Sequence, residues 1–85
     1  MTTIGMVLFP QLTQLDLTGP YEVFCMIPES RVHLIAASLE PVVAEHGLTI
    51  LPDTDFASAP PLDVLFVPGG MGINAMLELS VAAGD

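Results

Sequence analysis

The amino-acid sequence predicts an α/β domain with a doubly wound sheet whose core strands are parallel. Three short runs are almost entirely apolar, which is typical of strands covered on both faces: residues 4–9 (IGMVLF), 32–37 (VHLIAA) and 64–67 (VLFV). Between the first two runs, apolar residues recur near helical spacing over residues 12–27, until Pro28. Strand, helix and strand within about 30 residues indicate a βαβ unit. We therefore expect the sheet order 32–37, 4–9, 64–67.

The predicted helix contains Gly19 and Pro20, and we expect an interruption there. Two arrangements fit the sequence. Either Gly19 caps a helix that has Pro20 at its first position and Glu22 at its third, or the helix continues through Pro20 with a kink. In the second case the carbonyl of Asp16 loses its backbone donor. Both arrangements place Asp16 at the end of a structural element.

The rest of the chain has weaker patterns. Residues 41–51 (PVVAEHGLTIL) predict a short hairpin, with Gly47 supplying a positive φ in its turn. Residues 53–63 (DTDFASAPPLD) predict a connection over the surface. Residues 71–79 (MGINAMLEL) form a weak helical pattern after the run 64–67, which is expected to be an exposed apolar edge.

Length and charge limit the classes of function. An 85-residue chain with 52% hydrophobic residues can form one small packed domain. The formal net charge is −9 and Arg31 is the only Lys or Arg, which argues against direct binding to nucleic acid or anionic membranes. No signal-peptide pattern or membrane-length apolar run is visible, so we expect a cytoplasmic protein.

Two unusual features of the sequence are expected to meet in one crevice. In doubly wound sheets, ligands bind beyond the carboxyl ends of the strands. Asp16 follows the predicted central strand, and Gly69 and Gly70 follow the run 64–67. The glycines offer backbone N–H groups that can hold an oxyanion or a ligand carboxylate. Each feature also has a purely structural interpretation, as a helix cap for the acid and as a tight turn for the glycines.

Other reactive side chains give little indication of a site. Cys25, the only cysteine, lies within the predicted helix and is expected to be an inert buried thiol that alkylates slowly. His33 and His46 have no partner at a recognised metal-ligand spacing, so we expect no metal. No phosphate-loop or dinucleotide motif is present, so we expect no cofactor.

The segments VLFPQLTQLDLTGPYEVF, HGL and PPLDVLFVPGGMG resemble the amino-terminal half of the PfpI/ThiJ superfamily (class I glutamine amidotransferase-like), and within it the isonitrile hydratases. The resemblance implies a flavodoxin-like fold and a homodimer. It also implies a small-molecule substrate or ligand, with Asp16 as the family acid and Gly69 and Gly70 as the glycine turn facing the site. Isonitrile hydratases add water to an isonitrile to give an N-substituted formamide.

In this superfamily the nucleophilic cysteine lies on a later strand, to which Cys25 does not correspond. We therefore expect residues 1–85 to be a partial domain, truncated before that strand and inactive alone as a hydratase. The alternatives are a ligand-sensing domain of an AraC-type transcriptional regulator and a non-catalytic fragment.

Overall fold

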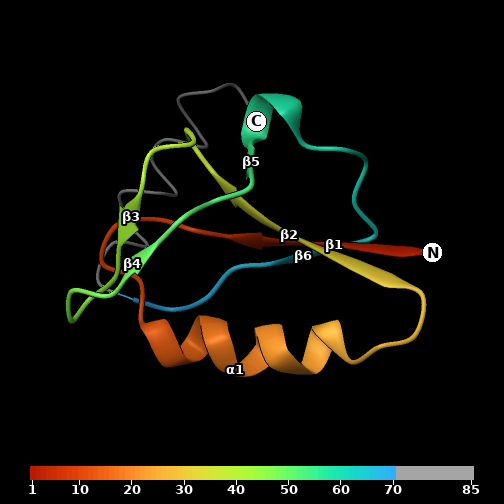
Figure 1. The fold of residues 1–85 in the computed structure, drawn as a ribbon, viewed down its shortest axis with the longest axis horizontal. Coiled ribbons are helices and arrows are strands. Elements are labelled where there is room, and N and C mark those ends of the chain that lie inside the picture. Colours follow the sequence, from red (N-terminus) through yellow and green to blue (C-terminus); the bar gives the residue numbers. More distant parts are fainter. Residues whose placement is uncertain (71–85) are drawn as a thin grey trace.

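The computed structural model describes residues 1–70, and it shows an α/β arrangement of short strands and one helix (Figure 1). The elements in chain order are β1 (Thr2–Val7), α1 (Gln14–Cys25), β2 (Ser30–Ala36), β3 (Val42–Val43), β4 (Thr49–Ile50), β5 (Thr54–Asp55), the 3₁₀-helix η1 (Phe56–Ser58) and β6 (Val64–Phe66). The helical pattern expected over residues 71–79 lies outside the described residues.

The main sheet has the order β5-β2-β1-β6, and each neighbouring pair is parallel. The register pairs Ile4 with both Val32 and Val64, so β1 is the central strand among the three predicted ones. Residues 4–9 are all buried, as expected of a strand with neighbours on both sides. The predicted fold class and strand order are therefore confirmed.

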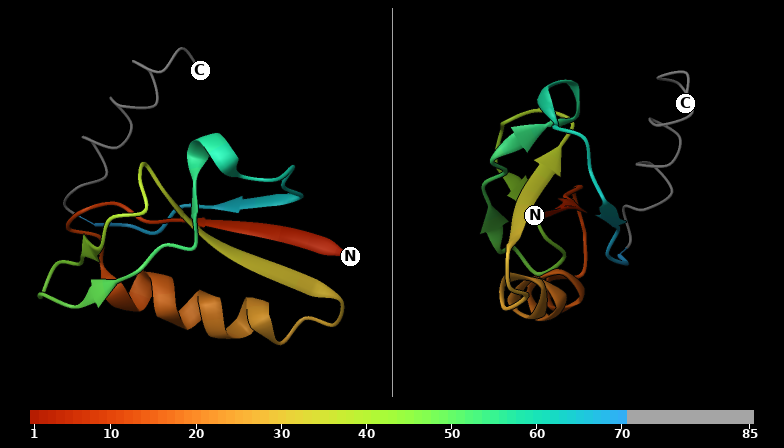
Figure 2. Two further views of the ribbon diagram at one scale, coloured as in Figure 1. Left: turned by 45° about the horizontal axis from the view of Figure 1, so that its top comes forward. Right: turned by 90° about the vertical axis from the view of Figure 1, so that its right-hand side faces the viewer.

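Helix α1 lies along one face of this sheet (Figure 2). Leu17 is buried, and Tyr21 and Phe24 pack partly buried against the core. The rings of Phe24 and Phe66 meet edge to face, with centroids 5.7 Å apart. Such a pair contributes about 0.5–1.5 kcal/mol beyond the burial of its surface, so it ties the helix to β6.

The expected arrangement in which Gly19 caps a new helix at Pro20 is wrong. Helix α1 runs without a break from Gln14 to Cys25, with Thr13 as its N-cap and Pro20 in its interior. Of the two arrangements, the structure has the helix that continues through Pro20, and Glu22 is therefore not a first-turn residue. Because proline has no N–H, the Asp16 carbonyl lacks its usual helical donor. The packing of Leu17 and Phe24 on the sheet offsets this loss.

The predicted hairpin is confirmed. Strands β3 and β4 pair antiparallel, Val42 with Ile50, and Gly47 has a φ of +97° in the turn. Figure 1 shows this hairpin at the end of the sheet where β1 leads into α1. There it is joined to the loop after β1, because the Gln11 amide donates to the Val43 carbonyl (3.0 Å).

The expected surface connection over residues 53–63 is wrong in part, because it contains β5 and η1. Two aspartates start the short strands in the same way. The Asp53 carboxylate accepts from the Leu34 amide (3.0 Å) just before β5, and the Asp63 carboxylate accepts from the Thr3 amide (2.8 Å) just before β6. Strand β5 has only two residues, which gives no periodicity to detect in the sequence.

Strand β6 forms one edge of the sheet, and Val64 and Leu65 on it are exposed. The expected exposed apolar edge is thus present within residues 1–70. No helix in this part of the chain is long and apolar enough to cross a membrane.

Candidate functional site

Asp16 occupies the third position of α1, at the end of the helix that follows the central strand. Its side chain is exposed, whereas the neighbouring Leu17 is 2% exposed. The Asp16 amide donates to the Thr13 carbonyl (3.1 Å), which fixes the first turn of the helix. An acid in the first turn is also stabilised by the positive end of the helix dipole. The helix therefore holds a solvent-accessible carboxylate beyond the carboxyl end of β1.

The structure brings this carboxylate against the glycine turn that follows β6. A Cβ atom on Gly69 would lie 3.2 Å from Asp16 Oδ2, so the two groups are in close contact. The sequence predicted this meeting because both segments follow neighbouring parallel strands.

Gly70 allows the turn to pack against the loop after β1. It forms an antiparallel bridge with Leu12, and the Thr13 amide donates to the Gly69 carbonyl (2.8 Å). Gly70 has a φ of +151°, and a Cβ atom there would lie 2.6 Å from both the Gln11 carbonyl oxygen and Leu12 Cα. A side chain would therefore push the two loops apart, and only glycine permits this approach.

Glu45 is a site residue that the sequence analysis missed. Its amide donates to the Leu12 carbonyl (2.8 Å), and its Oε2 accepts from Thr13 Oγ1 (3.2 Å). His46, whose side chain is 92% exposed, lies with its Nε2 3.5 Å from the other carboxylate oxygen. In the sequence the only signal was an acid directly before the predicted turn. The contact depends on how the hairpin packs against the loop after β1, which no local pattern reveals.

Cys25 does not join this site. It lies at the carboxyl-terminal end of α1, about 13 Å along the helix from Asp16. The expected burial of its thiol is wrong, because Cys25 is exposed. The apolar stripe of α1 is narrow, so Phe24 packs on the sheet while Cys25 and Met26 face solvent. A side-chain hydrogen bond with Cys25 raises the pKa of the Tyr21 phenol above its ordinary value of 10.0.

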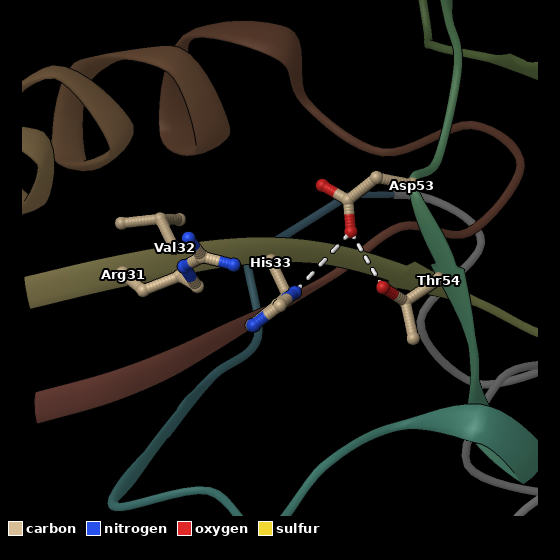
Figure 3. Close-up of a pocket in the computed structure, with 5 residues that line it drawn as sticks. All are labelled: Arg31, Val32, His33, Asp53 and Thr54. Carbon is tan, nitrogen blue, oxygen red and sulfur yellow. Dashed lines mark hydrogen bonds and ion pairs between the residues drawn. The ribbon is translucent and has the colours of Figure 1, made fainter.

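A shallow pocket of about 370 Å³ lies over β2 and the start of β5 (Figure 3). Its lining residues are Arg31, Val32, His33, Asp53 and Thr54. His33 and Thr54 both point to Asp53: Nδ1 of His33 is 3.6 Å from Asp53 Oδ1, and Thr54 Oγ1 donates to it (2.6 Å). The contact between His33 and Asp53 joins β2 to the residue before β5, and the pocket includes none of the residues around Asp16.

No group of three or more His, Cys, Asp or Glu side chains in residues 1–70 is placed to hold a metal ion. Within this range the candidate site is thus a carboxylate beside a glycine turn, with Thr13 and Glu45 behind it. Such an arrangement can exchange a proton with a small molecule.

Comparison with known proteins decides the family. The DJ-1/PfpI family model matches residues 2–84. The chain belongs to this family. Isonitrile hydratase from Pseudomonas putida is 49% identical over 75 residues, which are 88% of this chain and 33% of that enzyme. The chain therefore spans about a third of the length of this curated relative.

Solved structures of DJ-1/PfpI proteins share the fold of the chain. DJ-1beta from Drosophila melanogaster superposes with a TM-score of 0.84 at 27% identity, over 94% of this chain and 45% of that one. An AraC family transcriptional regulator from Pseudomonas putida superposes with a TM-score of 0.67 at 18% identity, over 99% of this chain and 61% of that one. At that identity the second likeness shows the fold alone.

Proposed function

We propose that this chain is the amino-terminal part of a DJ-1/PfpI domain of the isonitrile hydratase type. The observation that carries the proposal is the 49% identity to that enzyme over most of the chain. The contact between Asp16 and the glycine turn supports it, because it supplies an acid beside backbone groups at the ligand-binding end of the sheet.

The reaction needs two proton transfers, which an aspartate can assist. Hydration of R–N≡C adds one water molecule, so that the isonitrile carbon gains a hydrogen and an oxygen and the nitrogen gains a hydrogen, giving R–NH–CHO. In the proposed mechanism Asp16 donates and accepts protons during this addition. The backbone N–H groups of Gly69 and Gly70 stabilise the negative charge that develops on the substrate.

The nucleophile of the reaction is expected from a part of the domain beyond residue 85. The chain has one cysteine, and Cys25 lies at the far end of α1 from Asp16. We therefore expect residues 1–85 alone to show no isonitrile turnover. The homodimer and the partial-domain boundary stay predictions of the family resemblance, and the cytoplasmic location stays a prediction from the sequence pattern.

The test is a chimaera in which the matched residues of this chain replace their counterparts in Pseudomonas putida isonitrile hydratase. We expect it to convert alkyl and aryl isonitriles to formamides. Asp16→Asn should then lower kcat at least about a hundredfold, because general acid–base help contributes about 10²–10⁴ in rate. Glu22→Gln is the matched control, since Glu22 is an exposed acid of the same helix, away from its first turn.

The outcomes separate the candidate functions. An Asp16→Asn chimaera as fast as its parent, with folding verified by circular dichroism, removes Asp16 from the mechanism. A folded chimaera that binds isonitriles without converting them favours a ligand-sensing role, as in the AraC-type alternative. A folded chimaera that neither binds nor converts them favours a non-catalytic fragment.

A further inference from the structure

Thr13 connects three parts of the candidate site. Its amide donates to the Gly69 carbonyl (2.8 Å), and its own carbonyl accepts from the Asp16 amide (3.1 Å). Its hydroxyl donates to Glu45 Oε2 (3.2 Å). One residue thus joins the glycine turn, the first turn of α1 and the hairpin.

The hydroxyl of Thr13 has an unusual use for a helix N-cap. A threonine at this position ordinarily accepts a hydrogen bond from an amide in the first turn, which contributes about 1 kcal/mol. Thr13 makes no such side-chain cap, and its hydroxyl is directed to Glu45 instead. Helix α1 therefore lacks the side-chain hydrogen bond of a usual N-cap. In its place, the start of the helix is hydrogen-bonded to the hairpin.

Glu45 is fixed in a position from which its carboxylate can accept the hydrogen bond of Thr13. Its side chain is 24% exposed, and its main chain is fixed by the 2.8 Å bond to the Leu12 carbonyl. A hydrogen bond that includes a carboxylate is stronger than one between neutral groups. Partial burial increases that strength further by lowering the local dielectric constant.

We infer that Glu45 is a positioning residue for Asp16. Its carboxylate orients Thr13, and Thr13 holds the first turn of α1 at a set distance from the glycine turn. In this way Glu45 fixes the separation between the Asp16 carboxylate and Gly69. The effect on catalysis rests on the proposed function of Asp16, whereas the effect on geometry does not.

The geometric part is tested by amide hydrogen exchange, measured by NMR on the full 85-residue chain. Glu45→Ala should accelerate exchange of the Thr13 amide at least about tenfold, because the bond that this amide makes to Gly69 then opens more often. Glu45→Gln keeps an acceptor oxygen and should stay near the parent value. Thr13→Val and Glu45→Ala should both accelerate hydrogen exchange of the Asp16 amide. The double variant should exchange no faster than either single variant. Glu40→Ala, which removes an exposed acid before the hairpin, is the control.

Two results of this experiment would overturn the inference. One is exchange at Thr13 that is no faster in Glu45→Ala than in Glu40→Ala. The other is an equal acceleration at Met6 in the buried central strand, because it would show that Glu45→Ala lowers global stability and does not act locally.

The catalytic part is tested in the chimaera. Glu45→Ala should lower kcat about 10- to 100-fold with little change in KM, since misplacing a reacting group by about 1 Å can cost that much in rate. Glu45→Gln should restore most of the activity. An active chimaera whose kcat is unchanged by Glu45→Ala refutes the positioning role. An inactive chimaera refutes the proposed function instead, and hydrogen exchange then decides the geometric role of Glu45.

Discussion

Alanine substitution at three glycines of the chain should give variants of clearly different stability. Gly69→Ala should be the most stable, Gly47→Ala intermediate and Gly70→Ala the least stable. At Gly69 an added Cβ atom meets only Asp16 Oδ2, the end of a flexible side chain, at 3.2 Å. At Gly47 it meets nothing within 4 Å, but φ is +97°. At Gly70 φ is +151°, and the Cβ atom meets backbone atoms at 2.6–2.7 Å. The three positions therefore separate steric overlap from backbone strain.

The magnitudes follow from these environments. Every Gly→Ala change gains about 0.4–1 kcal/mol by restricting the unfolded chain, so Gly69→Ala should be neutral or slightly stabilising. A left-handed conformation costs an L-residue about 1–2 kcal/mol, which makes Gly47→Ala destabilising by about 0.5–1 kcal/mol. Gly70→Ala adds overlap with three backbone atoms, worth about 1–3 kcal/mol more. Its net cost of about 1.5–4 kcal/mol is a large part of the stability of a domain this size, about 4–13 kcal/mol.

Urea unfolding followed by far-ultraviolet circular dichroism measures this series. For small proteins the free energy of unfolding falls by about 1–3 kcal/mol per molar urea, so the Gly70→Ala midpoint should fall by about 0.5 M or more. Equal urea midpoints for Gly70→Ala and Gly47→Ala would show that the backbone overlap at Gly70 costs no stability, which contradicts the predicted order. In the active chimaera, Gly69→Ala should lower turnover without lowering stability, because the added methyl group displaces the Asp16 carboxylate.

Three further predictions concern Cys25 and its neighbour Tyr21 on α1. Because Cys25 is exposed, its thiol should react with a disulfide reagent about as fast in the folded chain as in urea; a reaction about tenfold slower in the folded chain would contradict the structure. Cys25→Ala should lower the pKa of Tyr21 toward 10.0, because Cys25 is the main cause that raises it. Tyr21 is the only tyrosine, so phenolate absorbance reports this pKa, and an unchanged titration would exclude the Cys25 contact. Since the folded state holds the phenol proton more tightly, the free energy of unfolding should decrease as the pH rises above 10.0.

The sequence by itself determined the three strands β2, β1 and β6 of the main sheet and where the candidate site lies. Apolar runs such as residues 4–9 record burial on both faces, and a βαβ unit of this length restricts how the strands can be ordered. The meeting of Asp16 with Gly69 also followed, because segments after neighbouring parallel strands emerge at the same edge of the sheet. These features depend on the periodicity of apolar residues and on the order of the elements, and both can be read from the sequence.

Only the tertiary structure decided the features that depend on packing between distant segments. Helix α1 continues through Pro20 because its contacts with the sheet offset the lost hydrogen bond, which local propensity does not predict. Cys25 is exposed because the orientation of α1 on the sheet selects which side chains are covered. Glu45 reaches Thr13, 32 residues away in the sequence, only because the hairpin packs on the loop after β1. All three features depend on contacts between residues whose separation in the sequence carries no periodic signal. Three-dimensional packing alone therefore specifies them.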